Sequence, residues 1–185
     1  VGEKIVGIGN NFLALEEMDI NGAFLSPSFI DGHVHLESSM VMPSEFAKTV
    51  IPSGTTSVIA DPHEIANVLG LDGISFIRET TRNLPLDVYI MLPSCVPATD
   101  METSGSRLSW NDLSLYINKE WVLGIAEMMN FPGVLNNNKD VIDKLKIVGN
   151  KRIDGHAPGL TGNNLCAYVS AGISSDHECT NVNEA

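Results

Sequence analysis

The stretch Phe29-Ile30-Asp31-Gly32-His33-Val34-His35 joins a short apolar run to a pair of histidines. The same pattern recurs along the chain, where short apolar runs alternate with amphipathic segments. The apolar runs are residues 29–31, 56–60, 88–92, 122–126, 152–155 and 173–175. Apolar strands separated by helices are typical of buried parallel strands in right-handed βα units.

Helix signals fill the intervals between these runs. Pro43 is suited to begin a helix that ends before Gly54, and Ser109 can cap another with Asp112 three residues on. Further helices are expected over 71–82, 138–148 and 161–171. A closed (β/α)8 TIM-like barrel needs eight units in about 250 residues. The sequence therefore predicts an α/β fold, a partial barrel of about six βα units. A six-stranded doubly wound sheet is the rival, although no Gly-rich phosphate turn follows the first strand.

The first 26 residues have a different character. Short apolar runs at 4–9 and 12–15 are broken by Gly and Asn, as in β-strands joined by turns. Two or three such strands do not form a stable sheet alone. We therefore expect residues 1–26 to be the remnant of a small β-sandwich and residues 27–185 to be the partial barrel.

Composition excludes several classes of partner. The 185 residues are 43% hydrophobic and carry a net charge of −12, which argues against nucleic acid and anionic membrane surfaces as partners. No apolar stretch approaches the roughly 18 residues that span a bilayer, and the first residues lack a signal-peptide core. The three cysteines are far apart and form no C-x-x-C pair. Reduced thiols and a cytoplasmic location are the expectation.

The histidines gather where the predicted strands end. All five follow a predicted strand: His33, His35, His63, His156 and His177. The carboxyl ends of barrel strands form one catalytic face. His33 and His35 are two residues apart and point to the same side of an extended strand. Glu127 ends the fourth run, and Glu37, Glu64, Asp176 and Glu178 flank histidines. Imidazoles and carboxylates converging on one face favour a divalent transition metal.

These stretches also resemble a known family, the amidohydrolase superfamily, and within it the members that deaminate adenine. The segments that carry the resemblance are Pro27–His35 with its continuation to Ser39, Asp61–Val68, Gly124–Asn130, Asp154–Leu160 and Ser174–Glu178. The resemblance runs over essentially the whole chain and implies a (β/α)8 barrel with an attached β-sandwich. Ser28 stands where the family usually has Gly.

The resemblance implies a site of two divalent metal ions. His33 and His35 would ligate the first ion, His156 and His177 the second, and Glu127 would bridge both. Mn²⁺ or Fe²⁺ suits such a mixed imidazole and carboxylate site, and Zn²⁺ is the alternative.

The implied reaction is hydrolysis of adenine to hypoxanthine and ammonia, a step of purine salvage, with hydroxide attacking C6. Glu64 and Glu178 would take catalytic roles in moving protons, and His63 and Glu37 would hold the purine. The family also has a catalytic Asp on an eighth strand and a C-terminal domain, and no position of this sequence matches them. The full-length protein is expected to be a homo-oligomer. Two alternatives stay open: another amidohydrolase acting on a cyclic amide, of dihydroorotase-like or deacetylase-like type, or an inactive structural fragment.

Overall fold

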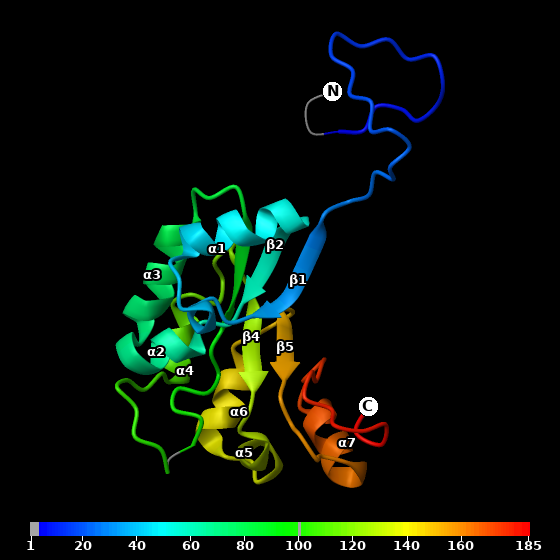
Figure 1. Cartoon of the computed structure of the whole chain (residues 1–185). Coiled ribbons are helices and arrows are strands. Elements are labelled where there is room, and N and C mark those ends of the chain that lie inside the picture. Colours follow the sequence, from blue (N-terminus) through cyan, green and yellow to red (C-terminus); the bar gives the residue numbers. More distant parts are fainter. Residues whose placement is uncertain (1–3, 100) are drawn as a thin grey trace.

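Five parallel strands form one curled sheet in the computed structural model, which describes residues 4–99 and 101–185 (Figure 1). The order in the sheet is the order in the chain. The strands are β1 (Phe29–Val34), β2 (Thr55–Ala60), β3 (Asp87–Leu92), β4 (Val122–Met128) and β5 (Arg152–Gly155). The predicted partial (β/α) barrel is confirmed, since parallel neighbours joined by helical crossovers are the repeating unit of that fold.

Helices connect the strands and cover the outside of the sheet (Figure 1). They are α1 (Pro43–Val50), α2 (His63–Leu69), α3 (Leu71–Thr81), α4 (Trp110–Ser114), α5 (Phe131–Leu135), α6 (Lys139–Lys146) and α7 (Gly162–Ser170), with 3-10 turns η1 (Glu37–Ser39) and η2 (Ile51–Ser53). Ser109 and Asp112 form the expected capping box at α4. Apolar side chains between sheet and helices, such as Ile74, Leu92 and Ile125, are fully buried.

The sixth expected strand, residues 173–175, does not form. Ser174 donates its N–H to the Ile153 carbonyl (2.9 Å), so the segment runs beside β5 after α7. It bends after that bond, and Asp176 instead accepts a hydrogen bond from the Ala157 N–H (3.2 Å) in the loop after β5. A single backbone bond is too little for a strand, because a ladder requires successive bonds along both segments.

The strands expected at 4–9 and 12–15 are also absent. Residues 4–26 contain no strand, are exposed, and extend away from the sheet beyond β1 (Figure 1). Two short runs without further strands cannot bury a face, so local β propensity alone does not make a sheet here. Residues 1–3 of the predicted sandwich segment lie outside the described residues, and the sandwich origin of the segment stays a prediction.

Two irregularities in strand pairing shape the edge where the strands end. Along β1 and β2, Asp31 pairs with Val58 but Val34 pairs with Ala60, so β1 holds one extra residue. Along β4 and β5, Ile125 pairs with Ile153 but Met128 pairs with Gly155, so β4 also holds one extra residue. Such bulges turn side chains out of the regular alternation.

In the described residues, no helix is both long enough and apolar enough to pass through a membrane.

Candidate metal centre

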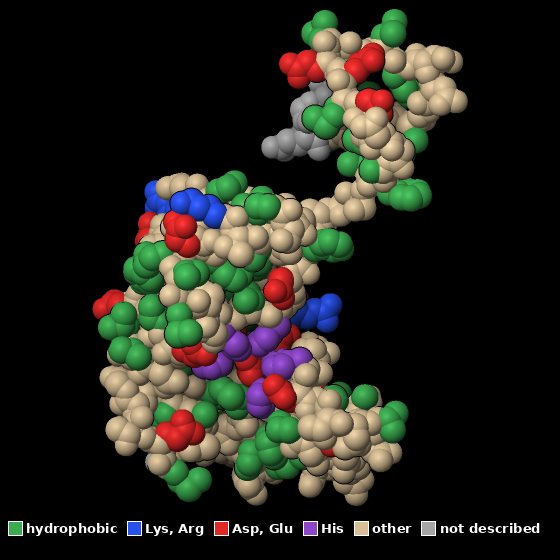
Figure 2. Space-filling view, viewed as in Figure 1, with side chains coloured by type: hydrophobic (Ala, Val, Ile, Leu, Met, Phe, Trp, Pro, Cys, Tyr) green, Lys and Arg blue, Asp and Glu red, His purple; other side chains and the backbone are tan. Residues whose placement is uncertain are grey.

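The candidate site lies at the carboxyl ends of the strands, where histidines and acidic side chains gather in a hollow of the surface (Figure 2). His33 lies in the bulge of β1 and His35 follows that strand; Glu127 lies in the bulge of β4, and His156 follows β5. Strands of one sheet therefore bring together residues that are far apart in the sequence.

Glu127 is the centre of this arrangement and is only 3% exposed. Its Oε1 lies 3.0 Å from Nε2 of His33 and 3.0 Å from Nε2 of His35. Its Oε2 lies 2.7 Å from Nδ1 of His156 and 3.5 Å from Nε2 of His177. Each carboxylate oxygen thus faces its own pair of imidazoles.

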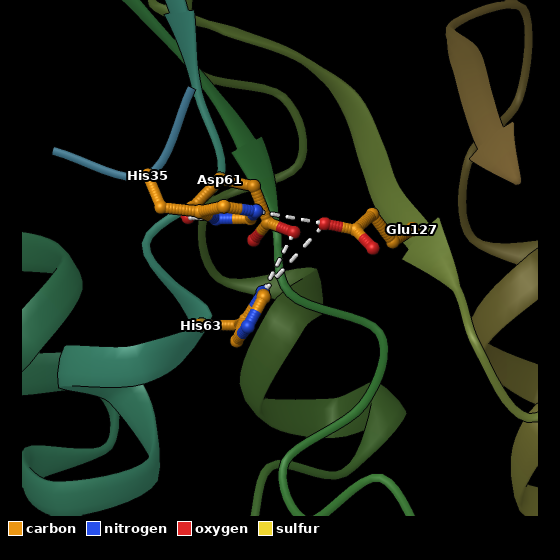
Figure 3. Close-up of side chains that lie close together, drawn as sticks. All are labelled: His35, Asp61, His63 and Glu127. Atoms are coloured by element: carbon orange, nitrogen blue, oxygen red, sulfur yellow. Dashed lines mark hydrogen bonds and ion pairs between the residues drawn. The ribbon is translucent and has the colours of Figure 1, made fainter. Parts of the chain in front are cut away.

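Asp61 and His63 adjoin the His35 side of the centre (Figure 3). His35 donates its Nδ1–H to the Asp61 carbonyl (2.8 Å), because a carbonyl can only accept. This bond leaves the Nε2 lone pair of neutral His35 directed at the centre. Asp61 Oδ2 lies 3.0 Å from Nδ1 of His63, and that nitrogen lies 4.0 Å from Glu127 Oε1. Asp61 is 1% exposed, so it holds His63 from inside the protein.

The pKa values of the titratable groups at this centre shift in different directions. Burial alone would raise the pKa of Glu127, but the imidazoles of His33 and His35 hold it well below its usual range. The contact with Glu127 raises the pKa of His35 to about 9. Burial raises the pKa of Asp61, and the bond from His63 only partly opposes this. For His63, burial acts to lower the pKa, but the Asp61 carboxylate outweighs it and the pKa is raised.

Unpartnered polar atoms indicate what this centre is built to hold. Glu127 Oε1, Asp61 Oδ1 and His156 Nδ1 are buried without a well-directed hydrogen bond, and Nε2 of His33 faces Nε2 of His35 at 3.1 Å. Buried polar atoms without partners are rare, since each costs about 1–3 kcal/mol. A cation bound between these nitrogen and oxygen atoms would satisfy them together.

Among the described residues, three sets of ligand atoms are close enough to hold a metal ion, because the atoms of each set lie within 4.8 Å of one another. The sets are His35, Asp61, His63 and Glu127; His33, Glu127 and His177; and His156, His177 and Glu178. The residues present therefore fit a metal centre in the part of the chain that the structure describes.

Comparison with known proteins places this geometry in a family. The profile described as Amidohydrolase family matches residues 24–185, which is most of the chain. The chain belongs to the amidohydrolase family. A family of metal-dependent hydrolases accounts for both the partial barrel and the converging imidazoles.

Curated relatives of this amidohydrolase share about half of its residues. It is 54% identical to a protein of Clostridium acetobutylicum named adenine deaminase, over 99% of this chain and 32% of that protein. It is 53% identical to adenine deaminase 2 of Carboxydothermus hydrogenoformans, over 90% of this chain and 29% of the relative. An Archaeoglobus fulgidus adenine deaminase is 49% identical over 97% of this chain and 32% of its own length. The chain thus spans about a third of the length of these relatives.

The remaining predicted site residues of this amidohydrolase lie at different distances from the centre. Glu178 lies with His156 and His177, so its carboxylate is within reach of the centre. Glu64 is exposed on α2 and accepts a hydrogen bond from the Ser38 hydroxyl (2.5 Å). Glu37 accepts the Ile65 N–H (3.1 Å) near the start of α2, the helix that begins with His63. The second oxygen of Glu37 is buried without a partner, and burial raises the pKa of this group.

Asp61 was not among the site residues predicted from the sequence. It was visible as a carboxylate at the end of the second apolar run, two residues before a histidine. Its carbonyl and carboxylate orient His35 and His63, so it belongs to the centre.

Proposed function

We propose that this chain carries the metal centre of an enzyme that hydrolyses adenine to hypoxanthine and ammonia. The observation that carries the proposal is Glu127, whose two oxygens face separate imidazole pairs at 2.7–3.5 Å. The relatives are named adenine deaminase, and this name supplies the substrate. The cyclic-amide alternative has no such support.

The donor set supports two divalent ions, His33 and His35 holding one, His156 and His177 the other, and Glu127 both. Mn²⁺ or Fe²⁺ is our first choice for this mixture of imidazole and carboxylate, and Zn²⁺ is the alternative. When bound, two ions close together would lower the pKa of a shared water toward neutrality and so supply the nucleophile.

The chain's own residues prepare the centre for that role. Glu127 stays ionised, since its pKa is held low, and it remains an anionic ligand near neutral pH. The bond of His35 to Asp61 directs Nε2 inward, so that the lone pair of the neutral imidazole is aimed at the centre. His63 is held in the same way through Nδ1, which leaves Nε2 for the purine.

Two carboxylates are proposed to serve proton transfer during deamination. Glu178, which lies beside His156 and His177, is proposed to protonate a ring nitrogen as water adds to C6. Glu64 is proposed for the same type of proton transfer, although one of its carboxylate oxygens accepts a hydrogen bond from the Ser38 hydroxyl. Glu37 is proposed to support the purine-binding side by holding the start of α2.

The 185 residues alone are proposed to turn over adenine weakly. The chain spans about a third of the length of its relatives. We keep a cytoplasmic location and a homo-oligomeric full-length protein as part of the proposal. The free thiols Cys95, Cys166 and Cys179 fit a reducing compartment.

Ammonia release from adenine, measured with Mn²⁺ or Fe²⁺ and with metal content read in parallel, tests the proposal. Glu127→Gln should lose bound metal and activity together. Glu79→Gln, an exposed carboxylate on α3, is the matched control and should behave like the wild type. Turnover of dihydroorotate or an N-acetyl sugar in place of adenine would favour the alternative amidohydrolase. Two bound metals without any turnover would favour the inactive fragment.

A further inference from the structure

A side chain joins the ends of β4 and β5 in addition to the pairing of their own backbones. Met128 on β4 pairs with Gly155 on β5. In a parallel ladder a carbonyl can accept the N–H of the residue that follows its partner, which here is His156. The hydroxyl of Tyr168 contacts both of these groups. It is 2.8 Å from the Met128 carbonyl and 3.1 Å from the His156 nitrogen.

A tyrosine is chemically suited to this place. The Met128 carbonyl can only accept a hydrogen bond and the His156 N–H can only donate one. A hydroxyl satisfies both at once, because it donates to the carbonyl and accepts from the amide. Tyr168 lies on α7 and is 1% exposed. Burial raises its pKa, so the phenol keeps the proton that it donates.

The backbone around the hydroxyl leaves it little freedom. A Cβ on Gly155 would lie 3.0 Å from the Tyr168 hydroxyl and 2.3 Å from the Ser175 carbonyl oxygen. Glycine at this position therefore permits the close approach of α7 to β5. The opposite side of β4 is held in a similar way, since Ser94 donates its hydroxyl to the Glu127 carbonyl (2.5 Å).

We propose that Tyr168 is a positioning residue of the metal centre. Its hydroxyl bonds to both the Met128 carbonyl and the His156 N–H, and so fixes the spacing of the paired strand ends that carry Glu127 and His156. Glu127 Oε2 and His156 Nδ1 lie 2.7 Å apart. The two hydrogen bonds of the Tyr168 hydroxyl go to backbone groups, so Tyr168 acts through the backbone of the residues that carry the ligands. This inference rests on the proposed function, because it concerns the second of the two proposed metal ions.

The test uses Tyr168→Phe, with Tyr116→Phe as the matched control. Tyr116 shares its hydroxyl with Ser75 (2.9 Å) on α3, so its loss also removes one hydrogen bond, but away from the centre. Stepwise Mn²⁺ titration by calorimetry should give two binding steps in the wild type and in Tyr116→Phe. In Tyr168→Phe one step should keep its affinity and the other should weaken at least tenfold. A folded Tyr168→Phe with both affinities unchanged would overturn the proposal.

Hydrogen exchange separates this proposal from the proposed function. In the metal-free wild type the His156 amide should exchange slowly, and in Tyr168→Phe at least tenfold faster, with its imidazole NMR signals shifted. Tyr116→Phe should change neither. A wild type that binds no Mn²⁺ refutes the metal assignment, and the NMR result still decides whether Tyr168 positions His156. If Tyr168→Phe fails to fold, the wild type decides alone: a His156 amide that exchanges as in an unstructured chain overturns the proposal.

Discussion

Replacing Glu127 by Gln keeps the shape of the side chain but removes the charge that faces His35 at 3.0 Å. In the metal-free wild type this contact raises the pKa of His35 from 6.5 to about 9. A raised pKa means that the protonated imidazole stabilises the fold fully below pH 6.5. That contribution is lost as the pH rises through about 9. In Glu127→Gln the main cause is gone, so this loss should largely disappear.

The structure sets the size of the effect. At about 1.4 kcal/mol per pH unit, the interval from 6.5 to about 9 is worth at most about 3.4 kcal/mol. The His35 side chain is 23% exposed, and water screens part of this interaction. We therefore expect the wild type to lose about 1–2 kcal/mol more unfolding free energy over this interval than Glu127→Gln.

Urea denaturation in the presence of a chelator, at pH 6.5 and at pH 9, measures this difference. Glu79→Gln, which removes an exposed carboxylate on α3, should follow the wild type. Equal losses of unfolding free energy in the wild type and in Glu127→Gln would refute the reasoning, because they would show that Glu127 does not control the protonation of His35.

Three further outcomes are expected. Added Mn²⁺ should raise the Tm of the chelator-treated protein by an amount that grows from pH 6.5 to 9, since imidazoles must lose their protons to bind a cation; a pH-independent increase in a thermal scan would contradict this. Gly124→Ala would place a Cβ 1.9 Å from the Arg152 carbonyl oxygen and should cost more than about 3 kcal/mol, whereas Gly32→Ala meets nothing within 4 Å and should cost about 1 kcal/mol or less. Equal costs in urea denaturation would show that the two strands can separate freely. Ser109→Ala should cost about 1 kcal/mol by removing the cap of α4, and Ser114→Ala less than half of that; similar values would mean that the cap does not stabilise the helix.

Much of the sheet could be predicted from the sequence because buried parallel strands carry a strong local signal. The runs that became β2, β3 and β4 are continuous and apolar, and helix signals lie between them. Residues 173–175 carry the same signal. Whether they pair with β5 depends on the position in which α7 ends, and this position cannot be predicted from the local sequence.

The convergence of His33, His35, His63 and His156 was predictable for the same reason, since parallel strands place their carboxyl ends at one edge. What could not be predicted is which atoms meet. The bulge that turns Glu127 toward two imidazole pairs arises from the register between β4 and β5. The bond from His35 to the Asp61 carbonyl depends on backbone placement. No local pattern marks Tyr168, because its partners, the Met128 carbonyl and the His156 N–H, lie at the ends of two strands that precede it in the chain.

The agreement between chain order and sheet order has a consequence for how the protein forms. Each βα unit packs beside the unit that precedes it in the chain. Pairing of neighbouring strands therefore closes only short loops, and the sheet can grow from β1 onward. His33, His35 and Glu127 can meet once β4 has joined, but His156 and His177 come together with them only after β5 has been added. A cation shared by both imidazole pairs would therefore tie β1 to β5, and its uptake would report that these five strands have come together.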